Sequence, residues 1–146
     1  NLPIGVIAIR TARLRSKSKF PTSAVGWCLR EVRECYRVNQ RDGSASEAWN
    51  NAGGRHAYNP RIHGTLEQFI HSIPRGAPVF WTGGNDGNGH IAIATGYRGL
   101  CFSTDIKRDG FFDKFPIADI AREWPALRLA GWAEIFNGQR VYPDAA

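Results

Sequence analysis

The sequence predicts an α+β domain in which N-terminal helices pack on an antiparallel β-sheet. Apolar residues recur at helical spacing in the first half of the chain, whereas β-branched and aromatic runs separated by Gly-rich turns fill the second half. A length of 146 residues, with 42% hydrophobic and 22% charged residues, is typical of one globular domain. We therefore expect a single domain over residues 1–146.

An apolar run from Leu2 to Ile9 opens the chain, and a basic stretch from Arg10 to Lys19 follows it. The apolar run is too short to span a bilayer, and it lacks a basic segment before it and a small-residue cleavage site after it. We therefore expect neither a signal peptide nor a membrane anchor. The basic stretch fits a solvated helix face and an arm equally well. A start at Asn1 and the lack of any Met indicate a domain excised from a longer polypeptide.

The next helix is expected from about Ala24 to Val38. Thr22 and Ser23 stand in front of it and are good N-cap residues. Apolar side chains then recur every three or four residues, as on one face of a helix. These positions are Val25, Cys28, Leu29, Val32, Cys35 and Tyr36.

Two capping-box signals predict two further short helices, one carrying Trp49 and one ending at Pro74. The capping pairs are Ser44 with Glu47 and Thr65 with Gln68. Between the two helices, the Gly/Asn-rich segment 53–64 is expected to form a loop.

The second half of the chain is expected to form the sheet, because its apolar runs are short and lie between Gly-rich turns. The expected strands are 77–81, 90–97, 99–104, 127–136 and 139–143. Residues 115–124 would add one or two helical turns, and Asn137-Gly138 reads as a hairpin turn.

The charge balance favours contact with an anionic partner. Nineteen basic residues stand against 13 acidic ones, which gives a formal net charge of +6. Nucleic acid, anionic lipid and cell-wall polymer all qualify, and a merely solubilising surface fits the same numbers.

Three cysteines, none in a CxxC spacing, suggest neither a full disulfide framework nor a zinc knuckle. Cys28 lies near the start of the expected helix, where unpaired backbone N–H groups and the helix dipole favour a thiolate, as a nucleophile requires. A buried structural role for Cys28 stays open at this point. Cys35 lies two turns deeper, Cys101 alternates with apolar neighbours in a strand, and both are expected in the core.

Among the four histidines, His90 is the candidate general base. It follows the flexible turn GGNDGNG and opens the strand IAIATG, which places the imidazole at a sheet end beside open backbone. A loop histidine facing water is the alternative. His71 falls in an apolar helical pattern, and His56 and His63 are expected on the surface because their spacing matches no standard zinc motif.

A base of this kind needs a third group to fix its tautomer and to support the imidazolium. Asp105 ends the strand after the one that holds His90, and a hairpin would return it close to the ring. We rank it first because strand pairing would hold it in place. The alternatives are Asp86, Asp109 and Glu134.

These residues together resemble the CHAP family of papain-like cysteine, histidine-dependent amidohydrolases and peptidases, in particular the N-terminal peptidase domains of endolysins from phages of actinobacteria. The resemblance covers roughly residues 22–141 in family order. The matching segments are GWCLREVRECY, SEAWNNA, IPRGAPVFWTGG, GHIAIATG, CFSTDI and GWAEIFNGQRV.

The resemblance implies a papain-like fold and a peptidoglycan hydrolase that cuts a peptide or amide bond, with Cys28 as nucleophile, His90 as base and Asp105 as the orienting residue. The residues expected to line the substrate groove are Trp27, Trp81, Gly83 and Gly84. Each of these four also fits plain packing or a turn. The Cys28 N–H would supply one oxyanion donor, since the upstream glutamine of papain has no counterpart here.

The same resemblance implies a lysin made in the host cytoplasm without a signal peptide, acting at the bacterial cell wall as a monomer. We expect no cofactor, no metal, no nucleic-acid partner and no membrane insertion. Calcium is not expected, because the stretch before Cys28 is basic where some relatives carry an acidic loop.

Two other classes of function compete with this one. A basic, non-catalytic module that binds cell wall or nucleic acid would explain the Arg10 to Lys19 stretch, although it needs no Cys/Gly-His pairing. A bacterial toxin or remodelling amidase would keep the fold and chemistry and change the substrate. The sequence does not distinguish an endopeptidase from an amidase.

Overall fold

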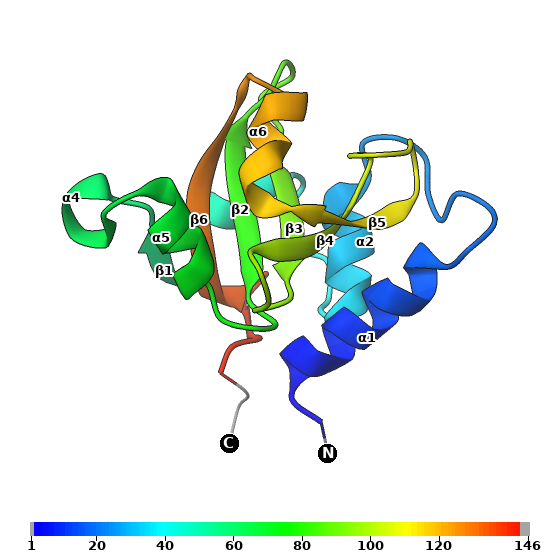
Figure 1. Ribbon diagram of the computed structural model, residues 1–146. Helices are drawn as coiled ribbons and strands as arrows, with labels where there is room; N and C mark the ends of the chain where they lie inside the picture. The colour runs from blue at the N-terminus through cyan, green and yellow to red at the C-terminus, as the bar shows by residue number, and fades with distance from the viewer. Residues whose placement is uncertain (1, 144–146) are drawn as a thin grey trace.

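One antiparallel sheet organises the chain in the computed structural model, which describes residues 2–143 (Figure 1). Over those residues the strand order is β1-β6-β2-β3-β4-β5, with β7 paired to β6, and every pairing is antiparallel. The strands are β1 (Gly53–Ala57), β2 (Pro78–Gly83), β3 (His90–Ala94), β4 (Leu100–Thr104), β5 (Phe112–Pro116), β6 (Leu127–Phe136) and β7 (Gln139–Arg140). The predicted α+β class with an antiparallel sheet is confirmed.

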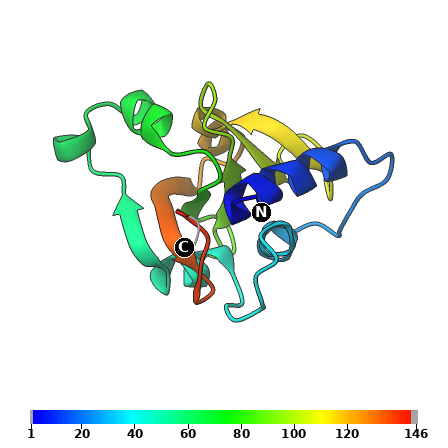
Figure 2. The ribbon, with the colours of Figure 1, turned by 90° about the horizontal axis from the view of Figure 1, so that it is seen from below.

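Helices cover both faces of this sheet. They are α1 (Ile4–Ser16), α2 (Cys28–Cys35), α3 (Ala45–Asn50), α4 (Pro60–His63), α5 (Leu66–Ser72), α6 (Ile120–Glu123) and the 3-10 turn η1 (Ile117–Asp119). Helices α1 and α2 lie side by side on one face, while α5 and α6 lie on the other (Figures 1 and 2). None of the helices between residues 2 and 143 is long and apolar enough to cross a membrane.

Because both faces are covered, the central strands are buried on both sides, and each face has its own core. In β3, Ile91 and Ile93 pack against α1 and α2, whereas Ala92 and Ala94 belong to the core under α5 and η1. This alternation follows from the two-residue period of a strand. Cys35 and Cys101 are buried in the two cores, as predicted.

The N-terminal run and the basic stretch form one helix, α1, so the helix-face alternative holds for residues up to Ser16. Its apolar side packs into the core through Ala8, Ile9 and Ala12. Arg15 turns toward α2, where its guanidinium lies 3.3 Å from the carboxylates of Glu31 and Glu34.

Both capping signals are confirmed. The Ser44 side chain accepts a hydrogen bond from the Glu47 N–H at the start of α3. Thr65 and Gln68 form a complete reciprocal capping box at the start of α5, which ends just before Pro74.

The predicted start of the Ala24 to Val38 helix was wrong, because the helix begins at Cys28. Gly26 adopts a φ of +88°, a left-handed conformation that stops the helix from extending backwards. Thr22 and Ser23 do not cap it; their backbone N–H groups donate to the Gly110 carbonyl at 2.8 and 3.2 Å. Cys28 is therefore the first residue of α2.

The loop expected over residues 53–64 was also partly wrong. Residues 53–57 form the edge strand β1, which pairs with β6, and α4 follows it. The sequence of β1, GGRHA, does not alternate between apolar and polar residues, so it carries little of the pattern that predicts a strand. The surface placement of His56 does hold: its ring stacks on Trp132 at 3.8 Å between centroids, and its Nε2 lies 2.7 Å from a Glu134 carboxylate oxygen.

Candidate active site

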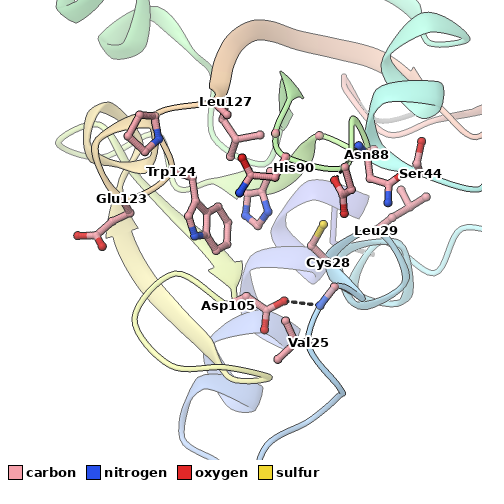
Figure 3. A pocket seen from close by; sticks show the side chains of 18 of the residues that line it. Val25, Cys28, Leu29, Ser44, Asn88, His90, Asp105, Glu123, Trp124 and Leu127 are labelled. Atoms are coloured by element: carbon pink, nitrogen blue, oxygen red, sulfur yellow. Dashed lines mark hydrogen bonds between the residues drawn. The ribbon is translucent and has the colours of Figure 1, made fainter.

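A cavity of about 650 Å³ opens where the start of α2, the start of β3 and the segment 123–127 meet (Figure 3). Six of the side chains in its wall matter for its chemistry: Cys28, Leu29, Asn88, His90, Trp124 and Leu127. They come from three stretches far apart in the sequence, 28–29, 88–90 and 124–127, so the fold alone brings them together.

The Cys28 thiol belongs to the wall of this cavity. Cys28 is 8% exposed, and the residues one and two turns further along α2, Val32 and Cys35, anchor the helix in the core. The backbone of Ile91, the residue directly after His90, lies close enough to the thiol to oppose the rise in its pKa. In Figure 3 the sulfur points toward the side of the cavity that holds the imidazole.

His90 is the first residue of β3 and is 3% exposed. Its ring contacts two indoles, with centroid distances of 5.8 Å to Trp81 and 5.1 Å to Trp124. Figure 3 shows Trp124 on one side of the ring and Cys28 on the other. The imidazole therefore borders an apolar aromatic wall and the thiol.

Regular pairing between β3 and β4 is confined to two residue pairs, Ile93 with Phe102 and Ala94 with Cys101. Closer to the cavity, the side chain of Ser103 connects the two strands in place of backbone hydrogen bonds. The Ser103 hydroxyl donates to the Ile91 carbonyl at 2.9 Å, and the Nε2 atom of His90 is hydrogen-bonded to the same hydroxyl. Ser103 is completely buried.

Asp105 does not make the ring contact expected of it, and we correct that expectation. Its carboxylate accepts hydrogen bonds from the backbone N–H groups of Gly26, at 2.9 Å, and Gly110, at 2.5 Å. Strand β4 ends one residue earlier, and Asp105 itself has a φ of +66°, so its side chain turns toward the loop before Cys28. Asp105 still lines the cavity, but the hydrogen bond to the His90 ring comes from Ser103.

The three alternatives to Asp105 lie elsewhere. Asp86 borders the cavity, where its carboxylate accepts from the Asn88 N–H at 3.0 Å. Glu134, on β6, pairs with His56 of β1 and Arg140 of β7. Asp109 is exposed in the turn after β4.

Burial reverses the expected ionisation of Cys28. Desolvation raises the pKa of its thiol to about 12; hydrogen bonds from the Ile91, Leu29 and Cys28 backbone oppose the shift, and the negative charge of Asp105 adds to it. The thiolate predicted from the helix start is therefore outweighed. Burial also lowers the pKa of His90 to about 3. Both shifts favour the uncharged form of the group at neutral pH, a thiol at Cys28 and a neutral imidazole at His90.

Of the four residues expected to line the groove, Gly84 borders the cavity. Trp81 is 1% exposed and packs against the His90 ring, while Trp27 is 46% exposed beneath the Arg30 guanidinium, 4.8 Å from the ring centroid. Gly83 is at the end of β2, and a Cβ there would lie 2.6 Å from the Ala126 carbonyl, so it serves a close backbone approach.

Sequence reasoning missed Trp124, Leu127 and Ser103. Trp124 follows the end of α6 and directly precedes a proline, which cannot continue a helix. A large aromatic side chain at such a helix end, just before a strand, is the signal that could have identified it. Ser103 carries no comparable signal, because serine in a strand is ordinary.

The cavity wall differs in charge from the molecule as a whole. Its ionisable side chains besides Cys28 and His90 are Asp86, Asp105 and Glu123, and no Lys or Arg is among its lining residues. In residues 2–143 no cluster of three or more His, Cys, Asp or Glu residues is arranged to hold a metal ion.

Comparisons of the chain with protein-family models, with curated proteins and with solved structures found no match. The cavity combines a thiol, an imidazole and open space for a substrate, which are the three requirements of thiol acyl transfer.

Proposed function

We propose that this protein is a cysteine-dependent hydrolase that cuts a peptide or amide bond of bacterial peptidoglycan. The observation that carries the proposal is that Cys28, at the first position of α2, and His90, at the first position of β3, line the same cavity. This arrangement supports acyl transfer, because a nucleophile and a base must reach one substrate carbonyl.

In the proposed reaction, His90 takes the proton from the Cys28 thiol as the sulfur attacks the substrate carbonyl carbon. The S–C bond forms, the C–N bond breaks, and the imidazolium returns the proton to the leaving amine. Water then hydrolyses the thioester and regenerates the thiol. The Cys28 N–H, at the first helical position, has no partner four residues back within the helix and is the proposed oxyanion donor.

The finer assignment to a papain-like fold of the CHAP type belongs to the same proposal. It is supported by the cysteine-bearing helix packed against the sheet and by the histidine that heads a central strand. Peptidoglycan as substrate rests on the resemblance of the motifs and on the net charge of +6, which would draw the domain to an anionic wall.

Purified peptidoglycan tests this proposal. The wild-type protein should release new amino groups from the wall, and Cys28→Ala should release none. Cys35→Ala is the matched control, because it removes a thiol from the same helix but away from the cavity. Wall hydrolysis by Cys28→Ala would overturn the thiol mechanism, and mass spectrometry of the fragments would identify the bond.

A basic binding module is the second candidate, and the exposed cations of the N-terminal region favour it. Arg10, Arg13, Lys17 and Lys19 are exposed. Retention on DNA or on wall polymer that falls with salt, without release of any wall fragment, would favour this role over hydrolysis.

A further inference from the structure

The hydrogen bonds of Ser103 fix the proton on the His90 ring. A serine hydroxyl has one hydrogen to donate and two lone pairs to accept with. Ser103 donates that hydrogen to the Ile91 carbonyl, 2.9 Å away. Toward His90 the hydroxyl can then act only as an acceptor, so the Nε2 atom bonded to it must carry a hydrogen.

A neutral imidazole holds one hydrogen, and with it on Nε2 the Nδ1 atom keeps a free lone pair. The neutral state follows from the surroundings of the ring, since His90 is 3% exposed, contacts Trp81 and Trp124, and touches no carboxylate in the described residues. Nδ1 is therefore the nitrogen left to act as a base.

We propose that Ser103, held by the Ile91 carbonyl, is the positioning residue that keeps His90 in its Nε2–H tautomer and so makes Nδ1 the proton acceptor for Cys28. The inference deepens the proposed hydrolase. When Cys28 attacks, its proton moves to Nδ1, while the other hydrogen stays on Nε2 and remains hydrogen-bonded to the Ser103 hydroxyl oxygen. The proton on Nδ1 later passes to the leaving amine. The hydroxyl of Ser103 thus fixes the tautomer of the ring, a role that a carboxylate or amide would otherwise have.

The same backbone carbonyl explains why a serine can do this. Ile91 lies where β3 and β4 have stopped pairing regularly, so its carbonyl is free to accept from a side chain. Its backbone also lies close enough to the Cys28 thiol to lower the pKa of that thiol. Ile91 is thus next to both the nucleophile and the positioning residue.

Nitrogen NMR of the His90 ring tests the tautomer directly and needs no substrate. Wild-type protein should show hydrogen on Nε2 and a bare Nδ1 at pH 7. Ser103→Ala should lose this preference, and Ser103→Thr, which keeps the hydroxyl, should restore it. Thr104→Val is the matched control: the Thr104 hydroxyl is also completely buried but has no hydrogen-bond partner in the described residues, so the ring signals should not change.

Wall hydrolysis gives the second readout. Ser103→Ala should lower kcat about tenfold, the equivalent of one lost hydrogen bond, with KM unchanged and Thr104→Val like wild type. Hydrogen on Nδ1 in the wild type, or the same tautomer in Ser103→Ala, would overturn the inference. If the wild type leaves the wall intact while the ring signals behave as expected, the proposed substrate is wrong and the role of Ser103 stands.

Discussion

The carboxylate of Asp105 accepts a hydrogen bond from the backbone N–H of Gly26 at 2.9 Å, across 79 residues of chain (Figure 3). Gly26 lies two residues before Cys28, in the left-handed turn that ends where α2 begins. With its second bond, to the Gly110 N–H, Asp105 fastens the loop before the nucleophile to the turn after β4. Asp105 thus positions the thiol side of the cavity, while Ser103 holds the imidazole side.

Replacing Asp105 should therefore destabilise the protein. Asp105→Ala leaves two N–H groups without an acceptor and should cost about 3 kcal/mol of unfolding free energy, and Asp105→Asn less, since one amide oxygen remains. Urea unfolding measures both. Asp109→Ala, in the exposed part of the same turn, should unfold like wild type. A loss below about 0.5 kcal/mol in Asp105→Ala would contradict this role.

Alkylation of Cys28 should be slow at neutral pH. Because its pKa is raised to about 12, the thiolate fraction and the iodoacetamide rate should rise about tenfold per pH unit from pH 7 to 10 without a plateau. Peptide mass spectrometry separates Cys28 from Cys35 and Cys101, whose pKa values burial also raises. A plateau near pH 7 would show that Cys28 rests as a thiolate.

The stability of the protein should fall in acid because His90 is buried as the neutral ring. Its pKa is lowered from 6.5 to about 3 in the folded state, so between these values the unfolded chain binds the extra proton. The contribution of neutral His90 to the free energy of unfolding is fully present above pH 6.5 and is lost as the pH falls toward 3. Between pH 7 and pH 5, wild type should lose about 2 kcal/mol more than His90→Gln. Equal losses in urea titrations would contradict this.

Trp124 should govern how strongly the His90 ring resists protonation. Its indole meets the ring edge-on at a centroid distance of 5.1 Å. Trp124→Ala admits water to the ring and should raise the His90 pKa toward 6.5, as an NMR pH titration would record. Trp27→Ala, which removes an exposed indole away from the ring, should leave the titration of His90 unchanged. An unshifted pKa in Trp124→Ala would assign the desolvation to Trp81 alone.

Local signals predicted the elements that local interactions form. The capping pairs at Ser44 and Thr65 and the apolar runs of β2 and β3 act within a few residues, and the structure has them where expected. Edge strand β1 was missed because its pairing with β6 depends on a partner 78 residues away, at Arg55 opposite Ala133, and not on its own pattern.

The site was predicted only in part, again because local patterns are visible in the sequence and long-range contacts are not. Cys28 and His90 follow glycine-containing turns that are visible in the sequence, and the fold brings both residues to one cavity. The residue that bonds to the ring was not predicted, because Ser103 and Asp105 point to the same side of a regular strand and only the end of β4 separates their directions. The carboxylate of Asp105 is held by the backbone of Gly26 and Gly110, and Gly26 is distant from it in the sequence.

The parted ends of β3 and β4 carry a lesson for engineering. Beyond the Ile93–Phe102 pair, the hydroxyl of Ser103 replaces a backbone hydrogen bond between the two strands, next to the cavity that Cys28 of helix α2 also lines. Grafting only a cysteine and a histidine onto an evenly paired sheet would omit this opening. Moving the cysteine and the histidine to another scaffold therefore also requires two strands that stop pairing at this point, a serine that connects them, and the backbone carbonyl to which that serine donates.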